Sequence, residues 1–212
     1  MWELEPEQRR LIWWNAALWT AGNTLTSGAF LSYFANDLGA SATALAVLAA
    51  TPEMVGAAGL GSRAAWHATG DRRLTWLIVT LIARLTTFLI PLIGLGRGSL
   101  GTTAPWVLVG ILVVAQAAQG IATTLYYSWL SDLVSPGQRG ALLAGRNIVS
   151  LAVTLVLPVA AGRFRDWARH QTDPHLVWWC YCAVFGLGAS LLLASVIPMW
   201  RIVHPPVGPA GG

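Results

Sequence analysis

The chain has 212 residues, of which 55% are hydrophobic and only 10% are charged. Soluble domains carry about 25% charged residues, so this sequence has too little polar surface to cover a water-soluble globule. The basic residues are all arginines, and they form no basic stripe with an aromatic stacking platform, so the net charge of +4 does not indicate a nucleic-acid partner.

Six apolar runs are each long enough to cross a bilayer, which takes about 20 helical residues. They cover residues 11–35, 41–62, 74–95, 105–131, 140–162 and 176–200. The sequence therefore predicts an all-α membrane protein with six transmembrane helices in residues 11–200. A cytoplasmic segment, 1–10, precedes them, and a linker or tail, 201–212, follows. The first run is followed by no clear cleavage site, so we expect it to stay in place as the first helix.

Charge and tryptophan placement predict the orientation of these helices. With the N-terminus in the cytoplasm, most arginines fall in the inner connecting segments, as the positive-inside rule requires. Arg163, Arg165 and Arg169 oppose this orientation. Most tryptophans fall near the predicted helix ends, where indole rings prefer the interface. We therefore predict a multi-pass protein of the plasma (cytoplasmic) membrane, such as a bacterial inner membrane, with both termini cytoplasmic.

Two ionisable residues lie deep inside predicted helices, Glu53 in the second and Arg84 in the third. A charge at mid-bilayer costs at least about 2.5–3.5 kcal/mol, so each needs a partner or a role. Both lie roughly 13–15 Å from the inner end of their helix. We therefore predict an intramembrane ion pair, which is either a static packing contact or an element that couples transport to a proton or a substrate.

Two predicted helices carry stripes of polar residues. Asn15, Trp19, Asn23 and Ser27 follow one face of the first helix, and Gln116, Gln119, Thr123 and Tyr127 follow one face of the fourth. Asn23 and Gln116 fall near mid-membrane, where transporters hold their substrates. Two interpretations stay open: the stripes line a substrate cavity, or they form interhelical hydrogen bonds that hold the bundle together.

The sequence predicts no enzyme, no cofactor and no metal site. All four histidines, His67, His170, His175 and His204, lie in predicted loops or beyond the last span. No H-E-x-x-H motif occurs, and no G-x-S-x serine has a paired membrane histidine. Cys180 and Cys182 are two positions apart on one predicted helix, so they point to different faces.

Three segments of the sequence are similar to short signatures of a known protein family. The loop after the second span ends in Gly70, Asp71, Arg72 and Arg73, in the style of G-x-x-x-D-[RK]-x-G-[RK]-[RK]. In the fourth helix, Gln116 to Gly120 is similar to R-x-x-Q-G, with glutamine in place of arginine. The loop after the fourth span is similar to D-x-x-x-P-x-x-R-G-x-x-x-G-x-R through Asp132, Pro136, Arg139, Gly140, Gly145 and Arg146.

By these motifs the chain resembles the N-terminal six-helix half of a major facilitator superfamily transporter. The resemblance implies secondary-active transport of an unknown small solute across the lipid membrane. It also implies a second six-helix half, which is encoded by the same gene, by a separate chain or by a second copy of this one. We expect Asp132 to pair with Arg139 or Arg146, and Gly145 to admit a neighbouring helix. The competing hypothesis is a six-helix assembly or regulatory subunit that does not transport.

Overall fold

The computed structural model describes residues 6–173 and 175–202, without the side chains of Asp132 and Leu133. All regular structure in this part of the chain is helical, which confirms the all-α prediction. The elements are α1 (Pro6–Thr26), α2 (Gly28–Asp37), α3 (Ala42–Ala50), η1 (Thr51–Glu53), α4 (Met54–Gly59), α5 (Ser62–Thr69), α6 (Arg72–Thr87), α7 (Leu89–Leu95), α8 (Arg97–Leu100), η2 (Gly101–Thr103), α9 (Ala104–Leu133), α10 (Pro136–Arg169), α11 (Leu176–Ala194) and α12 (Val196–Trp200).

Five helical segments of the described chain are long and apolar enough to cross a membrane. They are Ala42–Gly59, Arg72–Leu95, Arg97–Ser131, Pro136–Arg169 and Leu176–Trp200. These segments correspond to the second to sixth predicted spans, so the chain has the character of a multi-pass membrane protein. The predicted first span, 11–35, is not among them, because the polar side chains of α1 lower its mean hydropathy.

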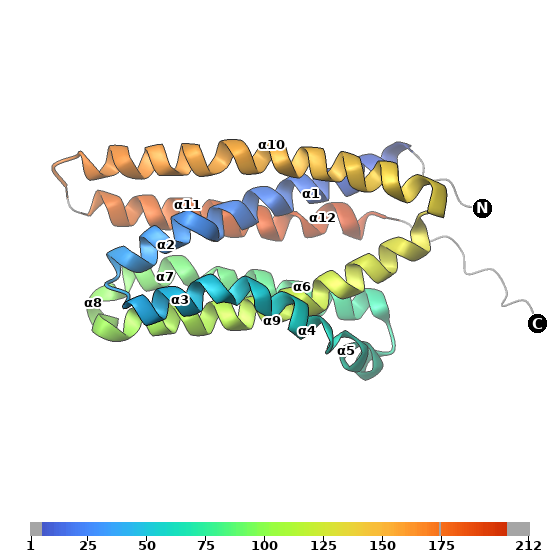
Figure 1. The fold of residues 1–212 in the computed structure, drawn as a ribbon, viewed down its shortest axis with the longest axis horizontal. Helices are drawn as coiled ribbons and strands as arrows, with labels where there is room; N and C mark the ends of the chain where they lie inside the picture. The colour runs from blue at the N-terminus through green and yellow to red at the C-terminus, as the bar shows by residue number, and fades with distance from the viewer. Residues whose placement is uncertain (1–5, 174, 203–212) are drawn as a thin grey trace, which may run out of the picture.

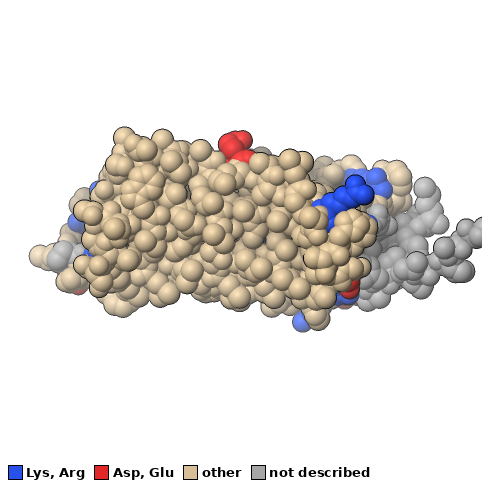
Figure 2. All heavy atoms as spheres, turned by 90° about the horizontal axis from the view of Figure 1, so that it is seen from below, with Lys and Arg blue, Asp and Glu red and all other residues tan. Residues whose placement is uncertain are grey.

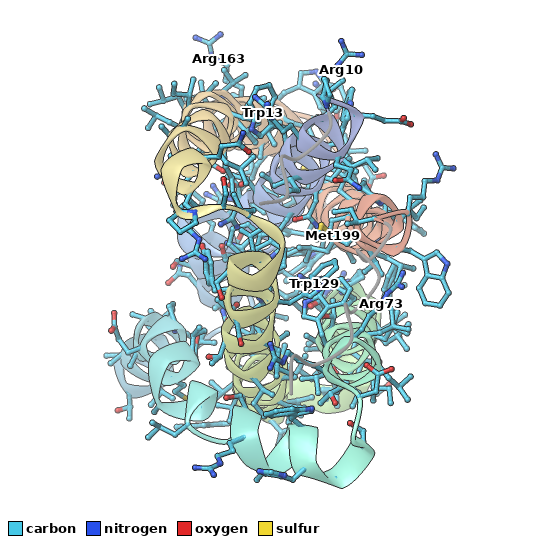
Figure 3. All side chains as sticks on the ribbon, turned by 90° about the vertical axis from the view of Figure 1, so that its right-hand side faces the viewer. Arg10, Trp13, Arg73, Trp129, Arg163 and Met199 are labelled. Atoms are coloured by element: carbon cyan, nitrogen blue, oxygen red, sulfur yellow. The ribbon has the colours of Figure 1, made fainter. Side chains whose placement is uncertain are left out.

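The helices form an elongated bundle in which the long segments run side by side along one axis (Figure 1). α1 packs mainly on α10 and α11, whereas α9 packs mainly on α4 and α6. Seen along the bundle, α1 and α9 lie at the centre of the two groups (Figure 3). Contacts between α7 and α11 join the groups to one another.

This packing has an internal symmetry. The first three segments are α1–α2, α3–α4 and α6–α7, and the last three are α9, α10 and α11–α12. The first segment of each triplet packs on the second and third segments of the other, and the two third segments touch through α7 and α11. The contacts of the first triplet thus mirror those of the last.

Close backbone contacts set the distances between these helices. A Cβ added at Gly120 in α9 would lie 2.2 Å from the carbonyl oxygen of Val55 in α4. A Cβ at Gly22 in α1 would lie 2.5 Å from the carbonyl oxygen of Gly188 in α11. Small residues are the usual means by which membrane helices approach this closely.

Two apolar clusters fill the bundle, one toward each end. The first surrounds Phe34, Tyr181 and Phe185, whose rings pack at centroid distances of 5.0–6.2 Å. The second contains Trp129 and Met199, which lie between α9 and α12 (Figure 3). Along α9 the first cluster ends at Leu112 and the second begins at Ala122. A band of polar side chains lies between them, as described below.

The outer surface suits a lipid environment. Figure 2 shows a face that is almost free of charged side chains along its length, with the arginines gathered near the two ends. The most lipid-like surface belongs to α10, where Ile148 is 69% exposed and Leu155 and Val156 are each 65% exposed. An apolar surface of this extent would not be stable in water.

One polar cluster, formed by Asp37, Arg165, Arg169 and Tyr181, joins α2, α10 and α11 at one end of the bundle. The Asp37 Oδ2 atom accepts hydrogen bonds from Arg165 Nη2 at 3.0 Å and from the Tyr181 hydroxyl at 2.5 Å, and its Oδ1 accepts one from Arg169 Nη2 at 2.6 Å. Arg165 and Arg169, two of the three arginines that oppose the predicted orientation, therefore bind Asp37 and stabilise this end of the bundle. The carboxylate of Asp37 compensates one of their two positive charges.

Candidate functional site

A half-open cavity of about 240 Å³ lies in the polar band, between α1, α6, α9 and α10. We call it the central cavity. Most of its lining is polar or aromatic. The lining residues are Asn15, Trp19, Trp76, Thr80, Arg84, Gln119, Ala122, Thr123, Tyr126, Tyr127, Arg146, Asn147, Ser150 and Ser195.

The two predicted polar stripes meet at this level. Asn15 of α1 and Gln119, Thr123 and Tyr127 of α9 line the central cavity, together with Trp19. The rest of the stripes, Asn23, Ser27 and Gln116, line a neighbouring space of about 30 Å³. That space shares Arg84 and Gln119 with the central cavity, so the two form one polar region.

Some stripe residues also hold the bundle together. The side-chain amide of Asn15 donates to the carbonyl oxygen of Ser195 at 2.7 Å, where α11 passes into α12. The Ser27 hydroxyl, in contrast, donates within its own turn, to the carbonyl oxygen of Asn23 at 2.6 Å, next to the break between α1 and α2. The two interpretations of the stripes are thus not exclusive, because interhelical bonding and cavity lining occur in the same stripe.

Arg84 projects from α6 toward α9 and is buried. Its Nη1 donates to the Gln119 side-chain oxygen at 2.7 Å, and the Gln119 amide donates to the Thr123 hydroxyl at 2.7 Å. The buried Nε of Arg84 has no hydrogen-bond partner in the described part of the chain. The guanidinium is therefore held in place by a neutral amide.

The predicted ion pair between Glu53 and Arg84 is not formed in the structure, which is a correction to the sequence analysis. Glu53 is exposed at the end of η1, whereas Arg84 is buried against Gln119. The reason is that α4 and α6 both pack on α9. Equal depth in two consecutive helices did not imply that their side chains face one another.

Arg146 reaches the central cavity from α10. Its guanidinium lies 5.3 Å, 5.4 Å and 6.0 Å from the ring centroids of Tyr127, Tyr126 and Trp19. Its Nη1 donates to the Tyr127 hydroxyl at 2.5 Å. The sequence placed Arg146 in a cytoplasmic loop motif, and its place in the cavity was missed. The signal in the sequence was that Arg146 lies within the predicted span 140–162 and not in the loop before it.

Unsatisfied polar atoms gather in the central cavity. Among the described residues, the buried side-chain atoms without a hydrogen-bond partner include Thr80 Oγ1, the Tyr126 hydroxyl, Arg84 Nε and Arg146 Nε. All four residues line this cavity. A buried polar group that lacks a partner costs about 1–3 kcal/mol, and folded proteins contain few of them. The unpartnered groups among the described residues are thus concentrated in one cavity.

Local structure accounts for the first loop motif. Gly70 ends α5 with φ +71°, a left-handed conformation that glycine adopts readily. The Asp71 carboxylate then caps α6 by accepting from the backbone N–H groups of Arg73 at 2.8 Å and Leu74 at 3.2 Å. Arg72 stacks over the ring of Trp66, and Arg73 donates to the carbonyl oxygen of Trp200 at 2.7 Å.

The second loop motif forms the turn between α9 and α10. Pro136 begins α10, and Arg139 donates to the carbonyl oxygens of Val134 at 3.0 Å and Ser131 at 2.6 Å, which caps the end of α9. A Cβ at Gly145 would lie 2.9 Å from the Trp13 indole, in agreement with the predicted close approach of another helix. Gly140 faces open space. The side chain of Asp132 lies outside the described part of the chain, and so does its predicted pairing with Arg139 or Arg146.

Comparison of the chain with protein-family models, with curated proteins and with solved structures finds no significant match. The functional proposal therefore depends on the sequence motifs and on the geometry of the central cavity.

Proposed function

We propose that this chain is one half of a secondary-active transporter of the major facilitator type, and that it holds a small solute in the central cavity. The observation that carries the proposal is a cavity lined mostly by polar and aromatic residues inside an apolar bundle, with two arginines and several unpartnered hydrogen-bonding groups in its wall. Transporters place their substrate sites at this level, between helices of two structural repeats. The pairing of the two helix triplets supports the same architecture.

The proposal counts α1 and α2 together as a sixth span. Asn15, Thr20 and Thr26 of α1 are buried, so their polar groups face the protein and not the lipid. Mean hydropathy counts these side chains as though lipid surrounded them. α1 also runs alongside α10 and α11 within the bundle (Figure 1), and this position requires it to share their environment.

The break inside this sixth span supports a transport role. Between α1 and α2, Ser27 has an extended backbone and Gly28 has φ +62°. The break borders a further cavity of about 370 Å³, which also includes Ser150 and Thr154 of α10. Irregular backbone within a membrane is tolerated where it lines a cavity, and discontinuous helices form the substrate sites of many transporters.

A second six-helix bundle completes the proposal. The central cavity is half open, and alternating access needs a second body that closes it from one side at a time. This second bundle is the remainder of a longer gene product, a separately encoded half or a second copy of this chain. We place the assembly in the plasma membrane with both termini cytoplasmic, an orientation that the pairing of Arg165 and Arg169 with Asp37 makes easier to accept.

Cysteine accessibility tests this proposal without knowledge of the substrate. Thr123→Cys is introduced into a Cys180→Ser/Cys182→Ser background and expressed with the second half of the transporter. A membrane-impermeant maleimide is then added to right-side-out or inside-out vesicles. Alternating access predicts labelling of Thr123→Cys from both sides, since Thr123 lines the central cavity.

Two control cysteines are labelled in the same way for comparison. Gly98→Cys, between two predicted spans, should label from one side only and reports orientation. Val156→Cys, on the exposed apolar face of α10, should label from neither side, because lipid excludes the charged reagent. Labelling of Thr123→Cys from a single side under all conditions would contradict transport and leave the assembly-subunit hypothesis.

A further inference from the structure

The central cavity has a definite charge. Arg84 and Arg146 enter it from opposite groups of helices, and none of the described residues in its lining is acidic. We propose that the solute is a small organic anion, whose carboxylate or phosphate group binds between these two guanidinium groups. The proposal deepens the transport function above and rests on it for the claim that the bound anion is carried across the membrane.

Arg84 supplies the first step of the argument. Its side chain is 6% exposed, and its hydrogen-bond partner is the neutral Gln119 amide. A buried arginine without a counter-ion is unfavourable within a membrane, where such residues pair or belong to substrate pathways. Glu53, which the sequence predicted as the counter-ion of Arg84, is exposed at the end of η1. A negatively charged solute would provide the missing counter-charge.

The free atoms of the two arginines supply the second step. In both Arg84 and Arg146 an Nη atom is bound by a neutral protein oxygen, while the Nε is buried and lacks a hydrogen-bond partner. The Nε and the neighbouring Nη form one edge of the guanidinium. This edge matches the two oxygens of a carboxylate or phosphate, which bind it through two parallel hydrogen bonds once the side chains that cover the Nε move aside.

Aromatic side chains hold the guanidinium of Arg146 in place in the cavity wall. Rings of Trp19, Tyr126 and Tyr127 border its guanidinium, and cation–π attraction of this kind holds an arginine without neutralising its charge. The Tyr127 hydroxyl accepts a hydrogen bond from one Nη atom of Arg146. The side chain is therefore ordered before any ligand binds, which favours tight recognition of an anion.

The rest of the lining favours an organic anion over an inorganic one. Trp19, Trp76 and Ala122 offer apolar surface, and the unpartnered hydroxyls of Thr80 and Tyr126 offer hydrogen bonds to a polar substituent. At about 30 Å³ per water molecule in the liquid, a volume of this size holds roughly eight waters. Inorganic phosphate would leave much of that space and the apolar wall unused.

Binding to the purified chain in detergent tests the anion. The probes are acids and their neutral counterparts of the same shape: lactate with lactamide, benzoate with benzamide, and glycerol 3-phosphate with glycerol. We expect at least one acid to raise the melting temperature, while its neutral counterpart does not. Inorganic phosphate is tested alone, and binding as tight as that of the best organic acid would overturn the organic part of the proposal.

Three variants locate the site. Arg84→Gln and Arg146→Gln should each weaken binding of that acid by at least about tenfold, because each removes a pair of charge-assisted hydrogen bonds. Arg163→Gln is the matched control, since Arg163 is on α10 like Arg146 but is exposed and points away from the bundle (Figure 3). Unchanged affinity in both cavity variants, or equal stabilisation by acids and neutral compounds, would overturn the proposal.

A measurement without ligand separates binding from packing. Arg84→Met removes an uncompensated buried charge and keeps a similar shape, so we expect the ligand-free protein to melt at a higher temperature. A fall of several degrees would assign Arg84 to packing and overturn its role in anion binding.

The binding and labelling experiments fail independently. Acid binding with one-sided labelling of Thr123→Cys would refute transport and keep the anion site. Two-sided labelling with no acid bound would refute the anion and keep transport.

Discussion

Replacing Asp37 by asparagine tests how far one carboxylate stabilises the end of the bundle. Asp37 accepts three hydrogen bonds, from Arg165, Arg169 and Tyr181. Asparagine has nearly the same size but no charge, and one of its two terminal groups donates hydrogen bonds. That group would face an N–H or O–H that also needs an acceptor. Arg165, which is 6% exposed, would lose its buried counter-ion.

The expected loss of stability follows from the exposure of each partner. Removal of one member of a buried ion pair costs about 3–5 kcal/mol, and the 8% and 13% exposure of the Arg165 and Asp37 side chains places their pair near the lower end. Arg169 is 47% exposed, so its contact adds at most about 1 kcal/mol. We expect Asp37→Asn to lose about 3 kcal/mol, which is a fall in melting temperature of about 6–12 °C for a chain of this size.

The assay is thermal unfolding of the purified protein in detergent, followed by the monodisperse fraction that survives heating. Asp166→Asn is the matched control, because Asp166 also approaches Arg165, at 3.8 Å, but its side chain is 69% exposed. This change should cost less than about 0.5 kcal/mol. Equal melting temperatures for the two variants would refute the assignment of Asp37 as the stabilising carboxylate.

Two further predictions concern the packing of the central helices. Gly120→Val should prevent recovery of monodisperse protein, since the added Cβ would lie 2.2 Å from a backbone oxygen of Val55. Gly110→Val on the same helix meets open space and should behave as wild type. Equal yields of the two variants would refute the close contact. Glu53→Gln and Arg84→Gln should change thermal stability additively, because the two residues do not touch, and a coupling energy above about 0.5 kcal/mol in the double-mutant cycle would contradict this.

The sequence predicted the helical segments well, because lipid imposes a strong and simple requirement on them. A run of about 20 apolar residues has few alternatives to a spanning helix. The segment 74–95, for example, corresponds to Arg72–Leu95 in the structure. The first segment was harder to judge, since residues such as Asn15 and Thr20 face the protein interior. Hydropathy averages over all faces of a helix and misses that difference.

Contacts between distant helices could not be predicted in the same way. The Asp37 carboxylate binds Arg165, 128 positions away, and no local pattern in the sequence connects the two. The predicted Glu53–Arg84 pair shows the same limit, because helix spacing gave the depth of each residue but not the rotation of its helix. Gln119 became the partner of Arg84 because α9, and not α4, packs beside α6 at that level.

The length of α10 suits a helix that spans a membrane. The exposed residues Arg139 and Arg163 stand 24 positions apart on one continuous helix, which is about 36 Å at 1.5 Å per residue. The hydrocarbon core is about 30 Å thick, so a membrane-spanning α10 is long enough to hold these two guanidinium groups in opposite headgroup layers. In that arrangement Arg146, roughly 10 Å further along the helix than Arg139, lies at the depth of the acyl chains.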